Sequence, residues 1–157
     1  MGSDQYRRGV YTHWQRTFLH PMLKAFDAPS REECTVARSR SNTPLQALTL
    51  LNDPTFVEAA RVFAERIIRE GVGTPNDRIQ WAHREAVSHQ PEAEVVAALR
   101  QIYDEHLVHY QEHADAAQQL ITAGNAPTAD DLDPAELAAW TSVARVVLNL
   151  HETIMRY

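Results

Sequence analysis

Four pairs of a capping residue and a proline divide this sequence into helical segments. They are Thr43-Pro44, Asp53-Pro54, Thr74-Pro75 and Asp133-Pro134. Proline is favoured at the first position of a helix, because its missing N–H would have no partner there. A preceding Thr or Asp caps the exposed N–H groups with its side-chain oxygen. These pairs predict four helix starts, and Gln90-Pro91 is a weaker fifth candidate because Gln is a poor cap.

Two further patterns support helix starts at these places. Thr43 with Gln46 has the spacing of a capping box, and Asp133 with Glu136 has the aspartate version of it. Ser30 and Glu33 share the same spacing. We therefore expect reciprocal side-chain caps at the helices that begin near residues 44 and 134, and a further cap near residue 30.

Apolar residues recur three and four positions apart after the predicted starts, as they do on one face of a helix. Such stripes cover residues 56–68, 95–107 and 137–148, and the spacing of Tyr11, Trp14 and Phe18 indicates an N-terminal helix. No segment alternates as a strand does. The sequence predicts an all-α, single-domain helical bundle of about six helices over residues 1–157. Residues 1–42 would form the first helix and a long irregular connection (19–42), and residues 43–157 the helical core.

The charges are distributed unevenly, although the net charge is −6. Residues 1–40 carry seven basic and four acidic side chains, whereas residues 85–136 carry eleven acidic side chains and one arginine. The acidic C-terminal half argues against binding of nucleic acid. No apolar run reaches the roughly 20 residues of a membrane span, and the N-terminus lacks the apolar stretch of a signal peptide.

The irregular connection is rich in polar residues that have specific geometric uses, and long loops inside a domain are often functional. The candidate binding residues are Asp27, Arg31, Arg38, Arg40, Gln46 and Asn52. Arginine forks bind carboxylates, sulfate or phosphate in pairs of hydrogen bonds. Two interpretations follow. In one, Asp27 and the arginines tie the loop to the helices, Gln46 completes a cap and Asn52 ends a helix. In the other, the arginines border a pocket for an anion or glycan.

The segment FDAPSREECTVARSRSNTPLQALTLLNDPTFVEAARVFAERI, residues 26–67, resembles the signature of the planctomycete-type domain of unknown function DUF1553. Residues 6–17 and 140–157 resemble the first and last helices of that family. The resemblance implies the C-terminal domain of a large exported protein, of which this chain would be a fragment. Such proteins often carry a cytochrome-c-like domain and a second helical domain, in bacteria rich in polysaccharide breakdown.

The favoured function is a non-catalytic helical module of an exported or cell-surface protein, without a cofactor of its own. It would bind an anionic ligand or acidic glycan, or pack on the other domains of its parent protein. A different class of function is a hydrolase or lyase acting on sulfated or acidic polysaccharide. In that alternative Asp27 serves as acid and base, while Arg31 and Arg38 stabilise the developing anion.

A zinc hydrolase is the third alternative. His109-Tyr110-Gln111-Glu112-His113 fits H-x-x-E-H, in which two histidines hold zinc and the glutamate activates water. The pattern needs a third ligand from elsewhere in the chain, for which Glu136 and Glu152 are the candidates. The competing interpretation is a set of solvated histidines on an acidic helix.

Overall fold

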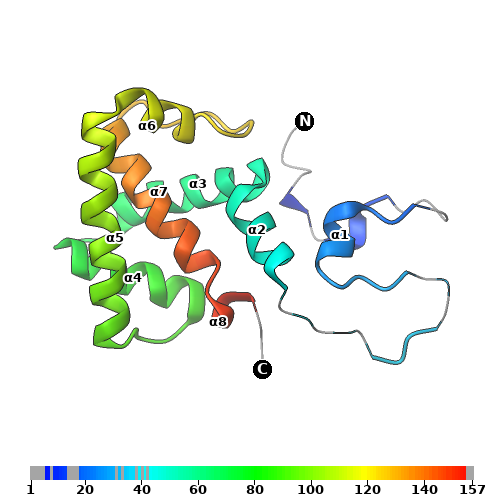
Figure 1. The fold of residues 1–157 in the computed structure, drawn as a ribbon. Helices are drawn as coiled ribbons and strands as arrows, with labels where there is room; N and C mark the ends of the chain where they lie inside the picture. The colour runs from blue at the N-terminus through cyan, green and yellow to red at the C-terminus, as the bar shows by residue number, and fades with distance from the viewer. Residues whose placement is uncertain are drawn as a thin grey trace. The chain divides into compact units, whose positions relative to one another are not determined.

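The structure is a computed structural model that describes residues 6–7, 9–13, 18–30, 32, 34–37, 39, 41 and 43–154. Its described residues form eight α-helices, so the predicted all-α fold is confirmed (Figure 1). A short 3-10 helix, Gly9–Tyr11, precedes them. The α-helices are α1 (Pro21–Ala25), α2 (Pro44–Asn52), α3 (Pro54–Glu70), α4 (Pro75–Val87), α5 (Ala93–Glu112), α6 (Ala114–Ile121), α7 (Pro134–Leu148) and α8 (His151–Ile154).

The chain divides into two compact units, Met1–Thr49 and Leu50–Tyr157, which we call the N-terminal and the C-terminal unit. The boundary falls within α2, a few residues after the predicted border between the loop and the helical core. Six of the helices, α3 to α8, lie wholly in the C-terminal unit. None of the helices among the described residues is long and apolar enough to cross a membrane.

The C-terminal unit is built around α7, which packs on α3, α5 and α6. Its side chains Leu137, Trp140, Val143 and Val147 are completely buried. Trp140 lies against Tyr103 of α5, with ring centroids 4.5 Å apart. Because burial of each large apolar side chain stabilises the fold by about 1.5–3 kcal/mol, α7 supplies much of the apolar core.

The predicted helix starts at Pro44, Pro54, Pro75 and Pro134 are confirmed. Asp53 caps α3 by accepting a hydrogen bond from Thr55 N, and Asp133 caps α7 by accepting one from Glu136 N. Thr74 and Asp77 form a complete capping box at α4. These caps act within one turn of chain, which is why local spacing was enough to find them.

One helix prediction was wrong, and another finds no support among the described residues. The fifth start lies at Ala93 rather than Pro91, and Glu92 precedes it without a side-chain cap. The N-terminal helix expected from Tyr11, Trp14 and Phe18 is not formed by the described residues. Tyr11 ends the 3-10 helix, Phe18 is extended, and Trp14 lies outside the described residues. Short helices depend on packing of their apolar face, and Tyr11 and Phe18 are exposed.

The connection at residues 19–42 is less irregular than expected, since α1 lies within it. Pro21 is the first residue of α1, and the side chain of His20 before it accepts no capping hydrogen bond. Ser30 accepts a hydrogen bond from Glu32 N, but Glu33, its predicted capping partner, lies outside the described residues. Helix α1 is five residues long and ends close to Asp27, whose φ of 57° turns the chain away from the helical path.

Candidate functional site

Asp27, the acidic candidate, receives hydrogen bonds from residues much later in the chain. Both of its carboxylate oxygens accept hydrogen bonds from Ser41 Oγ at 2.7 Å, and Oδ2 also accepts one from Ser41 N at 2.7 Å. Gln46 Nε2 donates to Oδ2 at 3.2 Å. These contacts close a loop of 14 to 19 residues onto one side chain and tie α1 to the start of α2.

Gln46 has two roles in the same network. It is 3% exposed, its Oε1 accepts from Thr43 N at 3.0 Å, and its backbone N donates to Thr43 Oγ1 at 3.3 Å. The predicted capping box at α2 is therefore confirmed. The amide Nε2, the other end of the side chain, donates to Asp27 and to Ser41 Oγ. Sequence reasoning did not select Ser41, although a serine hydroxyl between Asp27 and Gln46 can donate to the first and accept from the second.

The other candidates of this set are placed as follows. Arg31, Arg38 and Arg40 lie outside the described residues, so the arginine-bordered pocket stays a prediction. Asn52 is the last residue of α2 and is exposed. The structure thus brings Asp27 and Gln46 together and places Asn52 in the C-terminal unit. Cys34, the single cysteine, is exposed.

The hydrogen bonds of Asp27 bear on the acid–base hypothesis. A general acid or base must reach the proton that it transfers, directly or through one water. In this structure both carboxylate oxygens already accept hydrogen bonds from Ser41. The contacts therefore agree with the interpretation in which Asp27 ties the loop to a helix.

His109, Glu112 and His113 lie at the end of α5, and all three are exposed. His113 is the C-cap residue that follows α5, and the ring of His109 stacks on it with centroids 4.6 Å apart. The Nδ1 of His113 lies 2.9 Å from the carbonyl oxygen of His109. Within the described part of the chain, no three His, Cys, Asp or Glu side chains are grouped closely enough to hold a metal ion. The third ligand that the zinc hypothesis requires is not found there.

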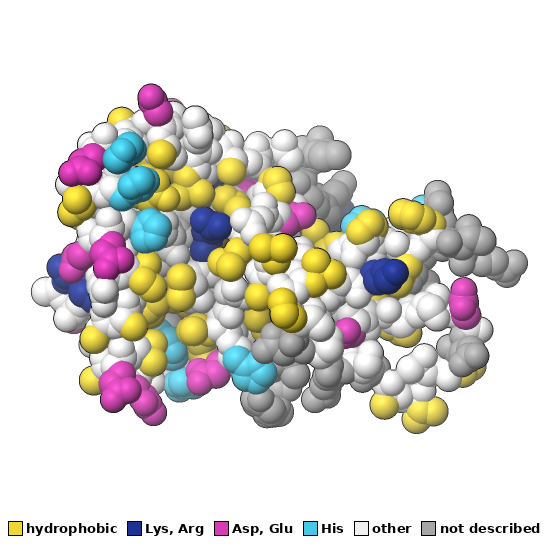
Figure 2. Space-filling view, in the orientation of Figure 1, with side chains coloured by type: hydrophobic (Ala, Val, Ile, Leu, Met, Phe, Trp, Pro, Cys, Tyr) yellow, Lys and Arg dark blue, Asp and Glu magenta, His cyan; other side chains and the backbone are white. Residues whose placement is uncertain are grey.

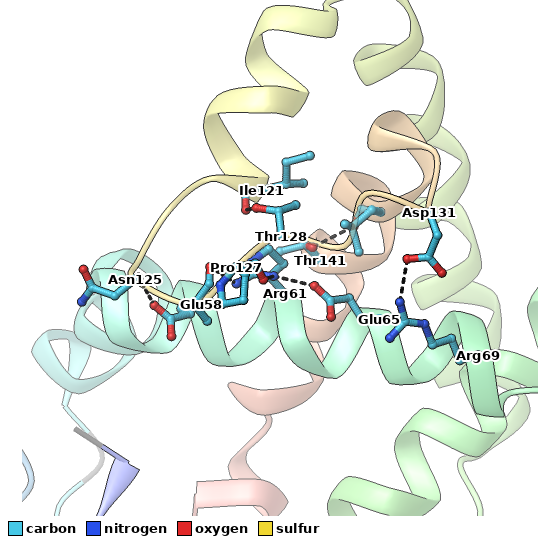
Figure 3. A network of polar contacts seen from close by, with 12 residues as sticks. Glu58, Arg61, Glu65, Arg69, Ile121, Asn125, Pro127, Thr128, Asp131 and Thr141 are labelled. Atoms are coloured by element: carbon cyan, nitrogen blue, oxygen red, sulfur yellow. Dashed lines mark hydrogen bonds and ion pairs between the residues drawn. The ribbon is translucent and has the colours of Figure 1, made fainter. Parts of the chain in front are cut away.

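A buried polar network, which sequence reasoning missed, lies between α3 and the segment that joins α6 to α7 (Figure 3). Arg61 is completely buried and Glu58 is 1% exposed. Arg61 donates to the carbonyl oxygens of Ala126 and Pro127 at 3.0 and 3.1 Å and to Glu65. Glu58 accepts a hydrogen bond from Asn125 N.

This network holds a proline-containing loop onto α3. At Gly124, where φ is +97°, a side chain would overlap the carboxylate of Glu58, so the loop and the helix are closely fitted. Arg69 and Asp131 add an exposed ion pair at 2.8 Å. The signal in the sequence was available, because Glu58 and Arg61 fall on the apolar face of α3 among Val57, Ala60 and Ala64. A charged residue on a buried face needs a partner.

A cavity of about 790 Å³ lies between α4 and α5. Four amide side chains line it, those of Asn76, Gln80, Gln90 and Gln101. Arg100, which also lines it, is paired with Asp104 at 2.9 Å. None of the candidate catalytic, binding or metal-ligating residues selected from the sequence lines this cavity.

The profile of one protein family matches residues 1–103, which is more than half of the chain. The chain belongs to the PSD1 family, described as protein of unknown function (DUF1553). The match includes the loop, the Asp27 network and α2 to α4, and it ends within α5. The resemblance of residues 140–157 to the last helix of the family lies beyond the match and stays a prediction. No curated protein and no solved structure shows significant similarity to the chain.

Proposed function

We propose that this PSD1-family chain is a non-catalytic helical module that packs its N-terminal unit on another domain of an exported or cell-surface protein. The observation that carries the proposal is the exposure of apolar side chains in that unit. Among its described residues, Val10, Tyr11, Phe18, Leu45 and Leu48 are 58–71% exposed. The exported location rests on the family resemblance alone.

Single exposed apolar residues are common on soluble proteins. The contrast between the exposed apolar side chains and the buried polar one within this unit is therefore more informative than any single exposed residue. The only buried residue among the described residues of the N-terminal unit is Gln46, which is polar. Apolar side chains that find no core of their own are typical of surfaces that contact another protein. Leu45 and Leu48 stand three positions apart in α2, which is the spacing of one helix face.

The exposed apolar side chains also indicate the chemistry of the partner. Figure 2 shows apolar side chains exposed over much of the face that it presents, with acidic side chains scattered among them. A partner domain with an apolar patch would remove such side chains from water, and each one fully buried would add about 1.5–3 kcal/mol to association. The partner chemistry is therefore an apolar protein surface.

The enzymatic alternatives gain less support from the geometry. Both oxygens of Asp27 accept hydrogen bonds within the protein. His109 and His113 stack on each other at the end of α5. Binding of an anion or acidic glycan by Arg31, Arg38 and Arg40 is a separate prediction, for which the thermal unfolding of the chain with sulfated or uronic-acid oligosaccharides is the test.

The packing proposal is tested by mixing the purified chain with the separately expressed other domains of a family protein and measuring association by calorimetry. We expect binding by the wild type and a loss of at least about tenfold in affinity in the double variant Leu45→Ser/Leu48→Ser. Val108→Ser is the matched control, because Val108 is 55% exposed on α5 of the C-terminal unit. No association of the wild type, or equal loss in the control, would contradict the proposal.

A further inference from the structure

A second, open cavity of about 410 Å³ lies in the C-terminal unit. Four helices and the end of α2 contribute to its lining, with Asn52 from α2, His109 and Tyr110 from α5, Gln119 from α6 and Arg145 from α7. Apolar side chains complete it, namely Leu51, Val57, Ala116, Leu120 and Ala123. It is therefore a mixed site, with hydrogen-bonding groups set in apolar walls.

Arg145 is the residue that distinguishes this cavity. Its side chain is half-buried, and Nη2 donates to the carbonyl oxygen of Leu51, which orients the guanidinium. Its Nε is buried and has no hydrogen-bond partner among the described residues. Arg145 also forms no ion pair within the described part of the chain. Five other arginines of the unit do, namely Arg61, Arg66, Arg69, Arg78 and Arg100.

Arg84 also has no ion pair with a described residue, but it is exposed, so water solvates its charge. Arg145 is different, because partial burial removes water from a charge that no carboxylate compensates. A buried charge without a partner is unfavourable. Because no carboxylate among the described residues pairs with Arg145, its positive charge is available to an anion from outside the chain.

The electrostatic surroundings favour an anion. The described residues that line the cavity include no carboxylate, although the chain as a whole has a net charge of −6. The positive field reaches His106 nearby, since burial lowers the pKa of His106, the charges of His109 and Arg145 lower it further, and Glu105 opposes them. Figure 2 shows histidine side chains and a basic side chain gathered amid apolar surface on this part of the molecule.

We propose that this cavity binds a small organic carboxylate, whose charged group pairs with Arg145 and whose body lies against the apolar walls. A guanidinium prefers carboxylates because its planar fork matches their two oxygens. His109, Asn52 and Gln119 supply further hydrogen-bonding groups at the rim. The volume is at the lower end of the range of about 300–1,000 Å³ typical of small-molecule sites, which suits a single sugar acid or an aromatic acid.

The test is calorimetry or NMR titration of the whole chain with sodium glucuronate and with sodium phenylacetate, against sodium chloride at equal ionic strength. We expect saturable binding of at least one carboxylate. Binding of glucuronate alone would identify a sugar-acid site, and binding of phenylacetate alone an aromatic-acid site. Saturation by neither would overturn the proposal.

Arg145→Gln should weaken the binding by at least about tenfold, the usual effect of removing a hydrogen-bonded charge. Arg84→Gln is the matched control and should bind as the wild type does. Equal affinity in Arg145→Gln and the wild type would overturn the assignment of Arg145.

A second variant keeps the test decisive if Arg145→Gln fails to fold. Gln119→Glu changes an exposed residue of the same cavity and places a carboxylate where the ligand would bring its own. We expect it to fold and to lose affinity by at least about tenfold, because it repels the anion and competes for Arg145. Undiminished binding in a folded Gln119→Glu variant would contradict the proposal. The site lies in the C-terminal unit, so this result is independent of the packing proposed for the N-terminal unit.

Discussion

The C-terminal unit buries its apolar side chains, and the N-terminal unit exposes them. Every buried apolar residue among the described residues lies between Val57 and Val147. In residues 1–49 the buried position is taken by Gln46, which joins Asp27, Ser41 and Thr43 in a polar network. One polypeptide thus uses two different means to order its two units.

The two means differ in how much they stabilise. Apolar burial contributes about 25 cal/mol for each Å² removed from water, and α7 removes several complete side chains. A hydrogen bond between neutral groups contributes a net of about 0.5–1.5 kcal/mol, because it replaces a bond to water. We therefore expect the C-terminal unit to unfold cooperatively at the higher temperature. The N-terminal unit should open more easily, as a segment with few buried apolar contacts does.

The largest expected effect comes from truncating the same residue type in both units. Leu137 of α7 is completely buried, whereas Leu48 of α2 is 58% exposed. Leu137→Ala should lower the free energy of unfolding by about 3–5 kcal/mol, because it leaves a cavity in the core. Leu48→Ala should change it by less than about 0.5 kcal/mol. Urea unfolding followed by circular dichroism measures both, and similar values would contradict the contrast between the units.

The next effect concerns the buried network of α3. Arg61→Met keeps most of the side-chain volume but leaves Glu65 and two loop carbonyls without their donor. We expect a loss of about 2–3 kcal/mol, since removal of one partner leaves buried charge uncompensated. Arg66→Met is the control, because Arg66 is 46% exposed and its ion pairs contribute at most about 1 kcal/mol. Equal losses of thermal stability in the two variants would show that burial does not increase the contribution of the network to stability.

A smaller and local effect is expected in the N-terminal unit. Asp27→Ala removes the acceptor shared by Ser41 and Gln46. Because each hydrogen bond contributes a net of about 0.5–1.5 kcal/mol, we expect faster amide exchange and proteolysis in residues 19–46. The unfolding midpoint of the C-terminal unit should not move. A shift of that midpoint as large as the one caused by Leu137→Ala would contradict the expectation that Asp27 stabilises the N-terminal unit alone.

The smallest effect concerns the exposed capping box of α4. The side chain of Thr74, and then its backbone N–H, lower the pKa of Asp77 below its usual value. A carboxyl with a lowered pKa in the folded state stabilises the protein above the pKa of the unfolded state, about 3.9 for Asp. That contribution is lost as the pH falls through the folded value.

Asp77→Asn should therefore lower the melting temperature slightly at neutral pH and have progressively less effect as the medium is acidified below about pH 4. Differential scanning calorimetry of both proteins at several pH values measures this. A difference in melting temperature that grows on acidification would contradict the lowered pKa of Asp77.

Much of the fold could be predicted because its signals are local. Asp53, Thr74 and Asp133 cap the helices that follow them, and the apolar stripe from Leu137 to Leu148 lies within α7. Two boundaries could not be found in this way. At Gln90-Pro91 the helix begins later, and at His113 α5 ends and α6 begins without a proline or glycine to mark the break.

The candidate site was predicted less completely. Asp27 and Gln46 were both among the residues selected from the sequence, and their contact across 19 residues is seen in the structure. Asn52 belongs to a different cavity, in the other unit. Arg145 was not selected, although it is a charged residue in an otherwise apolar stretch of α7. The role proposed for Arg145 depends on the lack of a nearby carboxylate among the described residues. Spacing along the chain does not reveal which charged groups lie close together in space.

The sequence by itself therefore determined the helical class, the four helix starts marked by a cap and a proline, and the family, since caps, prolines and apolar periodicity act within a few residues of each other. The tertiary structure alone decided which charges are buried, which are compensated and which side chains find a core. Glu58 and Arg61 meet their loop partners across more than 60 residues, and Arg145 meets Leu51 across 94. Burial and pairing are properties of segments brought together in space, so they exist only once the chain has folded.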